Sequence, residues 1–121
     1  MMVLIIGGRA SGKRDVALKR FGLEAQAVSP EKALHTPCID QFHEIIRQLL
    51  ARGEDSGQYV EKLMQQNPEA IILCDEIGMG IVPLSRDDRA WREAVGRACC
   101  RIAAQASQVI RVVCGLEQQL K

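Results

Sequence analysis

The sequence Gly7-Gly8-Arg9-Ala10-Ser11-Gly12-Lys13-Arg14 follows an apolar run at residues 3–6 and dictates the architecture of the chain. It meets the phosphate-loop pattern G-x-x-x-x-G-K-[ST] at Gly7, Gly12 and Lys13 and departs from it at Arg14. The apolar run predicts a buried strand, and residues 13–21 predict a helix. Because strand, loop and helix follow in the order that the pattern requires, we interpret the loop as a phosphate-binding loop rather than an ordinary glycine-rich turn.

Each part of this loop has a chemical role. Glycines let the backbone turn tightly, so that successive N–H groups and the N-terminus of the following helix face phosphate oxygens. Lys13 reaches the β- and γ-phosphates, and the residue after it is normally a Ser or Thr whose hydroxyl binds Mg²⁺. Arg14 has no lone pair to offer a metal, so we expect ATP or GTP to bind with a weakened Mg²⁺ site. The residues expected to bind the nucleotide are Gly7, Gly8, Arg9, Ala10, Ser11, Gly12, Lys13 and Arg14.

Length, charge and cysteine usage narrow the class of protein. The chain has 121 residues and a net charge of +1, which predict a single domain at residues 1–121 and give no reason to expect a nucleic-acid or anionic-membrane partner. It has no apolar run long enough to cross a bilayer and no signal-peptide pattern, so we expect a cytoplasmic location. Its five cysteines include no Cys-x-x-Cys pair, which favours free thiols over a metal site or disulfides.

The rest of the chain alternates between strand and helix patterns. Such alternation predicts an α/β, P-loop NTPase-like three-layer fold with a mostly parallel sheet. Residues 31–37 fit neither pattern and stay unassigned. The expected strands are 25–28, 70–74 and 109–114, and the strand at 109–114 is expected to be the final one. Helices are expected at 40–52 and at 87–106. A further helix between them is expected to be capped at Asp55 or Ser56 and to end at Asn67.

Two acidic residues, Asp75 and Glu76, follow the apolar run at 70–74. In phosphate-loop proteins an acid at the carboxyl end of such a strand can hold Mg²⁺ directly or through water. A solvated acidic turn is the alternative, and the loop at residues 7–14 makes us favour the metal or water role. Asp75 and Glu76 are therefore the expected metal-binding residues, and Lys13 and Glu76 the expected catalytic residues.

The residues that follow give the chain a family resemblance. Residues 75–83, Asp-Glu-Ile-Gly-Met-Gly-Ile-Val-Pro, resemble the N-E-V-G-x-G-I-V-P signature of the adenosylcobinamide kinase / adenosylcobinamide-phosphate guanylyltransferase family. The loop is similar to the family's G-G-x-x-S-G-K-S, and residues 112–116 with Lys121 are similar to its V-x-G-I-P-x-x-x-K close. The resemblance covers residues 3–21 and 70–121 and is weak between them.

The resemblance implies a cytoplasmic enzyme of the cobalamin pathway on a phosphate-loop fold. The family phosphorylates the aminopropanol hydroxyl of adenosylcobinamide with ATP or GTP, and many members then transfer GMP to that phosphate through a histidine–guanylate intermediate. Members are often trimeric. A nucleoside triphosphate, adenosylcobinamide and a second copy of the chain are thus the partners that the resemblance implies.

The chain departs from the family pattern at chemically important positions. Arg14 replaces a Ser, Asp75 replaces an Asn, and the basic H-x-x-R-R-P-like stretch that carries the guanylylated histidine has no counterpart. The two histidines of the chain, His35 and His43, match no family position. We interpret His43 as a surface or packed helix residue. Guanylyl transfer is therefore expected to be lost.

Two functions from different classes follow from these observations. The first is nucleotide-dependent phosphoryl transfer to cobinamide, and the alternative is a catalytically degenerate nucleotide-binding or interaction protein of the same fold. An unrelated small-molecule kinase would not explain the match at residues 76–83. Three interpretations of Arg14 stay open. Arg14 contacts phosphate as a cation, or it leaves the loop without a metal ligand that Asp75 replaces, or it pairs with Asp15 or Glu76 and blocks the site.

Overall fold

A computed structural model describes residues 1–77 and 85–121. The family signature covers residues 75–83, and its larger part, residues 78–83, lies outside the described residues. The centre of the structure is a six-stranded sheet in the order β2-β3-β4-β1-β5-β6. β1 pairs in parallel with β4 on one side and with β5 on the other, and β5 pairs with β6 in the antiparallel sense. The strands are β1 Val3–Gly7, β2 Gln26–Ala27, β3 Cys38–Asp40, β4 Ile71–Asp75, β5 Gln108–Val113 and β6 Leu116–Gln119.

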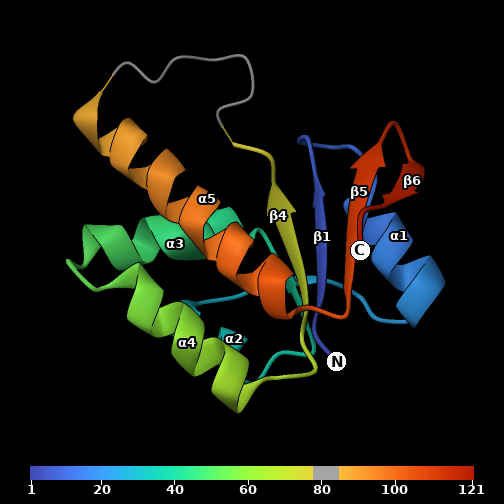
Figure 1. Ribbon diagram of the computed structural model, residues 1–121, viewed down its shortest axis with the longest axis horizontal. Helices are drawn as coiled ribbons and strands as arrows, with labels where there is room; N and C mark the ends of the chain where they lie inside the picture. The colour runs from blue at the N-terminus through green and yellow to red at the C-terminus, as the bar shows by residue number, and fades with distance from the viewer. Residues whose placement is uncertain (78–84) are drawn as a thin grey trace.

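Helices cover the sheet on both faces, which confirms the predicted three-layer α/β fold with a mostly parallel sheet (Figure 1). α1 lies on one face, and α3, α4 and α5 lie on the other. None of the helices among the described residues is both long and apolar enough to cross a bilayer. The helices are α1 Lys13–Phe21, α2 Pro30–Ala33, α3 Phe42–Ala51, α4 Ser56–Gln66 and α5 Arg86–Gln105.

The alternation of side chains along β1 explains the two cores. Leu4 packs into the cluster formed with α3, α4 and α5, whereas Val3 and Ile5 pack with α1. Ile5 and its partners Leu73 and Ile110 are fully buried, and β4 is buried on both faces, as expected of a central parallel strand. Burial on both faces fixes the strand register, because a shift by one residue would exchange the two faces.

The sequence prediction missed two strands, β3 and β6, and one short helix, α2. The helix expected from residue 40 begins at Phe42, because Gln41 has a φ of 51° and separates it from β3. β3 is three residues long and merges into the apolar repeat of the helix that follows it. α2 occupies part of the unassigned segment and is capped by the Ser29 hydroxyl, which accepts from the Lys32 N–H.

The final strand was also predicted incorrectly, because β5 is followed by β6. Cys114 and Gly115 both have positive φ values, 51° and 76°, and form the tight turn between them. All four residues of β6 are exposed, so this edge strand carries no apolar periodicity that a sequence could reveal. The turn matters for the site, because it lies against the phosphate loop.

Candidate functional site

The predicted phosphate loop, residues 7–14, is packed against the turn between β5 and β6. The Gly115 N–H donates to the Ser11 carbonyl over 2.7 Å. A Cβ on Gly7 would lie 2.5 Å from the Val112 carbonyl oxygen, and Gly12 has a φ of 103°. Glycine is therefore required at the first position by close backbone approach and at the second by a left-handed conformation. These contacts fix the loop backbone against the turn between β5 and β6.

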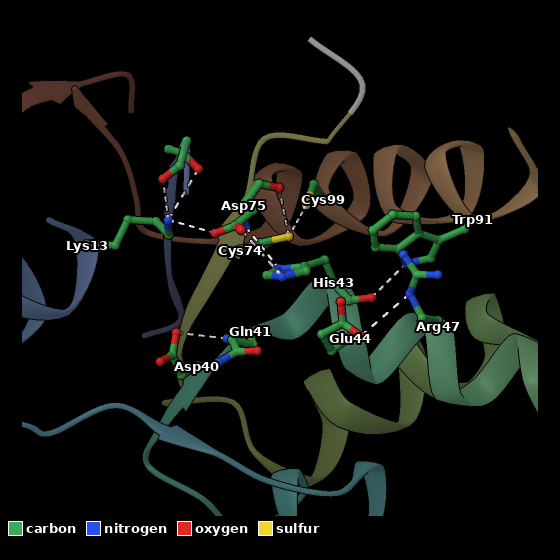
Figure 2. A network of polar contacts seen from close by, with 12 residues as sticks. Lys13, Asp40, Gln41, His43, Glu44, Arg47, Cys74, Asp75, Trp91 and Cys99 are labelled. Atoms are coloured by element: carbon green, nitrogen blue, oxygen red, sulfur yellow. Dashed lines mark hydrogen bonds and ion pairs between the residues drawn. The ribbon is translucent and has the colours of Figure 1, made fainter. Parts of the chain in front are cut away.

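Lys13 is the first residue of α1, and it is buried, with 7% of its surface exposed. Its ammonium group donates to the carbonyl of Gly8 over 2.8 Å and forms an ion pair with Asp75 Oδ1, also over 2.8 Å (Figure 2). A third, longer contact of 3.3 Å joins it to the Gly7 carbonyl. A buried ammonium requires such partners, and here all of them come from the ends of β1 and β4.

His43 supports Asp75 from below, as Figure 2 shows. Its Nδ1 accepts from the Asp75 backbone N–H over 3.2 Å, and its Nε2 lies 3.5 Å from Asp75 Oδ2. Burial lowers the pKa of His43, and the Asp75 carboxylate opposes this shift. Trp91 donates from Nε1 to the His43 carbonyl over 2.8 Å, which ties α5 to α3 at this point. Both ring nitrogens of His43 are thus directed at Asp75.

Asp40 is a buried carboxylate at the carboxyl end of β3, and the sequence reasoning missed it. Its Oδ1 accepts from the Gln41 N–H over 2.8 Å, and its Oδ2 lies 3.4 Å from Nε of Arg14. The Arg14 side chain is itself 68% exposed and also reaches the Ala25 carbonyl. The partner of Arg14 is therefore neither Asp15 nor Glu76. A strand assignment at 38–40 would have revealed Asp40 by the rule that singled out Asp75.

Glu76 lies at the same edge of the sheet but faces another partner. Its carboxylate accepts from Nε of Arg111 over 2.9 Å and from the second guanidinium nitrogen over 3.4 Å. The Glu76 N–H donates to the Gly7 carbonyl, which fixes the backbone beside the loop. The geometry therefore brings Asp75 to Lys13, whereas Glu76 is engaged by β5. A metal or catalytic role for Glu76 stays a prediction.

These groups line a cleft of about 760 Å³ at the carboxyl edge of the sheet. A second hollow of about 490 Å³ adjoins it, and the two share Asp40, Gln41 and Glu44. The cleft is lined by Arg9, Ala10, Ser11, Gly12, Lys13, Arg14, Asp15, Asp40, Gln41, His43, Glu44, Asp75, Glu76, Ile77 and Trp91. The second hollow is lined by Ala27, Val28, Ser29, Lys32, Asp40, Gln41, Glu44 and Gln48.

The donor groups in the cleft limit how a metal could bind. Within residues 1–77 and 85–121, no cluster of three or more His, Cys, Asp or Glu residues could hold an ion on its own. Asp75 and Asp40 offer carboxylates, and the side chain at position 14 is a cation. Mg²⁺ keeps several waters and often takes only one or two protein carboxylates together with phosphates. The residues therefore fit a hydrated Mg²⁺ that arrives with a nucleotide, rather than a metal held by the protein alone.

Comparisons with known proteins agree with this architecture. The sequence model of the family described as cobinamide kinase / cobinamide phosphate guanyltransferase matches residues 38–120. The bifunctional adenosylcobalamin biosynthesis protein CobU of Salmonella typhimurium is 38% identical over 69 residues, which are 56% of this chain and 38% of that protein. CobU of Escherichia coli is 40% identical over 53 residues, 44% of this chain and 29% of that protein. The matched stretch thus spans less than two fifths of either relative.

The ion pair between Lys13 and Asp75 yields a prediction for stability. Asp75→Asn is expected to lower the free energy of unfolding by about 3 kcal/mol, because it leaves a buried ammonium without its counter-charge. In a Lys13→Met background the same change should cost at least about 1 kcal/mol less. Urea unfolding of the four proteins at pH 7 measures this coupling, with Glu24→Gln as a control at an exposed carboxylate. Equal costs in both backgrounds would show that the two side chains act independently.

Proposed function

Since the chain belongs to the cobinamide kinase / cobinamide phosphate guanyltransferase family, we propose that it binds a nucleoside triphosphate and transfers the terminal phosphoryl group to a hydroxyl of cobinamide. The observation that carries this proposal is the position of Lys13, buried at the mouth of a glycine-rich loop and paired with the strand-end carboxylate of Asp75. A loop, a lysine and a strand-end acid in this arrangement are the parts that phosphoryl transfer uses.

The nucleotide phosphates would lie over residues 8–13, against backbone N–H groups and the N-terminus of α1. Lys13 already donates to the Gly8 carbonyl and to Asp75, so its ammonium can turn from these acceptors toward phosphate oxygens without leaving the site. Arg9 and Arg14 line the same cleft and add positive charge, and the Arg14 side chain is 68% exposed. Fixed cations of this kind stabilise the charge on the transferring group.

The acceptor would approach from the second hollow, which shares Asp40 with the cleft. The acceptor hydroxyl oxygen forms a bond to the terminal phosphorus while the bond between that phosphorus and the bridging oxygen breaks, and the nucleoside diphosphate leaves. Asp40 lies where the two hollows meet, so its carboxylate is the group that takes the hydroxyl proton. Mg²⁺, when bound with the nucleotide, would neutralise phosphate charge, and Asp75 is the carboxylate best placed to hold its waters.

Guanylyl transfer is proposed to be absent from this chain, although the family description includes it. A covalent guanylate on histidine needs a ring nitrogen with a free lone pair directed at the phosphate. Nδ1 of His43 is occupied by the Asp75 N–H, and Nε2 faces the Asp75 carboxylate. His35 precedes β3 and is exposed at the opposite edge of the sheet from the phosphate loop. Neither histidine is therefore presented to a bound nucleotide.

A second candidate function is nucleotide binding without transfer. The observation that favours it is the contact between Arg14 and Asp40, which places a guanidinium beside the carboxylate proposed to act as the base. A guanidinium in this position occupies one oxygen of the carboxylate and can keep an acceptor hydroxyl away from it. If the chain is a kinase, release of Asp40 from Arg14 should raise an existing phosphoryl-transfer activity. If the chain only binds nucleotide, the same release should create that activity.

Lys13→Ala tests nucleotide binding directly. Loss of charge-assisted contacts worth about 1.5–3 kcal/mol each should weaken binding of ATP or GTP at least tenfold. Titration with both nucleotides, with and without Mg²⁺, can be followed by calorimetry or by the fluorescence of Trp91, the single tryptophan, which lines the cleft. Lys19→Ala, at the exposed end of α1, is the matched control. Unchanged affinity in Lys13→Ala would mean that the loop is not the binding site.

The absence of guanylyl transfer gives a negative prediction. Incubation with GTP labelled at the α-phosphate should leave no acid-labile, base-stable label on the protein, because neither histidine offers a free nitrogen to the nucleotide. Gel analysis of the denatured protein measures the label, and a bifunctional relative that forms the intermediate serves as the positive control. A stoichiometric label that disappears in His43→Gln or in His35→Gln would contradict the prediction.

Arg14→Ser tests the departure from the loop pattern. The hydroxyl would supply the missing metal ligand, so Mg²⁺ should strengthen nucleotide binding more in Arg14→Ser than in the native chain. The change also frees Asp40, and phosphorylation of cobinamide should rise. Arg14→Lys keeps the charge without the hydroxyl and is the matched control. Brisk Mg²⁺-dependent activity in the native chain that Arg14→Ser lowers would make Arg14 a catalytic cation, and failure of both proteins to bind nucleotide would overturn the proposed function.

A further inference from the structure

Two cysteines from distant parts of the chain meet between the sheet and α5. Cys74 is the fourth residue of β4, and Cys99 lies in the second half of α5. Their Sγ atoms are 3.6 Å apart, and Figure 2 shows the two side chains directed at each other. A disulfide requires an S–S distance of about 2.05 Å, so the sulfurs would have to approach by only about 1.5 Å. The proposed phosphoryl transfer uses neither thiol.

The surroundings give the two thiols different access to solvent. Cys74 is fully buried, whereas Cys99 is partly exposed at the edge of the same core. A small oxidant from solution therefore meets Cys99 first, and the nearest group able to react with the oxidised sulfur is Cys74. This is the arrangement of a reactive thiol next to a resolving thiol.

We propose that Cys74 and Cys99 form an oxidisable dithiol, a covalent modification site whose co-reactant is a hydroperoxide and whose product is a disulfide that links β4 to α5. The Cys99 sulfur attacks the terminal peroxide oxygen, the O–O bond breaks, and water leaves when the co-reactant is hydrogen peroxide. The Cys74 sulfur then attacks the resulting sulfenic sulfur, forms the S–S bond and releases a second water. Two thiols lose two electrons and two protons, and one peroxide is reduced to two waters.

The other three cysteines differ from this pair in ways that make them internal controls. Cys38 packs in the core on the opposite face of the sheet, and burial raises the pKa of its thiol to about 11. Cys100 is the neighbour of Cys99 in α5 but is exposed, and Cys114 is exposed in the turn before β6. Across the described chain, which includes all five cysteines, the contact between sulfurs joins Cys74 to Cys99.

Oxidation at this place would act on the candidate site, a consequence that rests on the proposed function. Cys74 is followed directly by Asp75, whose carboxylate holds Lys13 and whose N–H is bound by His43. Closing the gap between the two sulfurs links the end of β4 covalently to the facing turn of α5 and should draw the two segments together. Because Asp75 shares that end of β4, the disulfide should displace the partner of Lys13 and weaken nucleotide binding.

The modification is tested on the reduced chain of 121 residues at low micromolar concentration. A modest excess of hydrogen peroxide should lower the mass by two daltons. After alkylation under denaturing conditions, the oxidised protein should carry two fewer alkyl groups than the reduced protein and yield a peptide in which residues 74 and 99 are cross-linked. Cys99→Ser and Cys99→Ala should each abolish the cross-link even though Cys100 is retained, and Cys100→Ser should leave it intact. Either Cys99 variant changes a partly exposed position, so the test does not depend on a substitution in the buried strand.

Three results would overturn the modification site. The first is oxidation of Cys100 or Cys114 while Cys74 and Cys99 remain reduced, and the second is a cross-link that survives in Cys99→Ser. The third is a main product with intermolecular disulfides. The measurement needs no nucleotide, so it stands or falls separately from the proposed kinase activity.

Coupling to the site is measured in a second arm. Titration of the oxidised protein with ATP and with GTP should give affinities at least about threefold weaker than those of the reduced protein, and dithiothreitol should restore them. Oxidation of Cys99→Ser should leave affinity unchanged. A cross-link without any change in affinity would overturn the coupling, whereas failure of the reduced protein to bind either nucleotide would overturn the proposed function and leave the dithiol in place.

Discussion

A buried ammonium group needs a counter-charge, and the ion pair between Lys13 and Asp75 meets that need. Lys13 can be buried only because β1 and β4 are paired in parallel, so that their carboxyl ends lie side by side. Asp75 in turn is oriented by His43, which α3 carries and α5 supports through Trp91. One electrostatic contact therefore depends on the sheet and on three helices, and it makes the loop a feature of the whole fold rather than of a local sequence.

The sequence predicts those features that arise from strong local patterns. The apolar runs of β1 and β4, the glycines of the loop and the amphipathic repeats of α3, α4 and α5 each carry a signal within a few residues. β3 and β6 do not, because one is three residues long and the other is exposed on all four side chains. The loss of β3 from the prediction removed Asp40 from the site, since the rule about strand-end acids applies only where a strand is recognised. The partners of Arg14 and Glu76 were equally beyond reach, because they depend on side-chain packing between distant segments.

The charges in the cleft are arranged in pairs that a ligand would have to rearrange. Lys13 is held by Asp75, Arg14 is near Asp40, and Glu76 is held by Arg111. All four residues of the first two pairs line the cleft, whereas Arg111 lies outside its lining. A phosphate group competes with carboxylates for the same cations, so binding would release Asp75 and Asp40 as it engages Lys13 and Arg14. The carboxylates freed in this way are the groups that a metal or an acceptor hydroxyl requires.

The two activities in the family's description place different demands on a chain. Phosphoryl transfer depends on positioning and fixed charge, and the loop, Lys13 and the strand-end acids can supply both from one edge of the sheet. Guanylyl transfer depends in addition on a nucleophile whose lone pair is free. Among the described residues, His43 is the only histidine that lines the cleft. Both of its ring nitrogens are directed at Asp75. The contact that orients Asp75 beside Lys13 is thus the same contact that occupies both ring nitrogens of His43, and it is the physical basis for proposing phosphoryl transfer without guanylyl transfer.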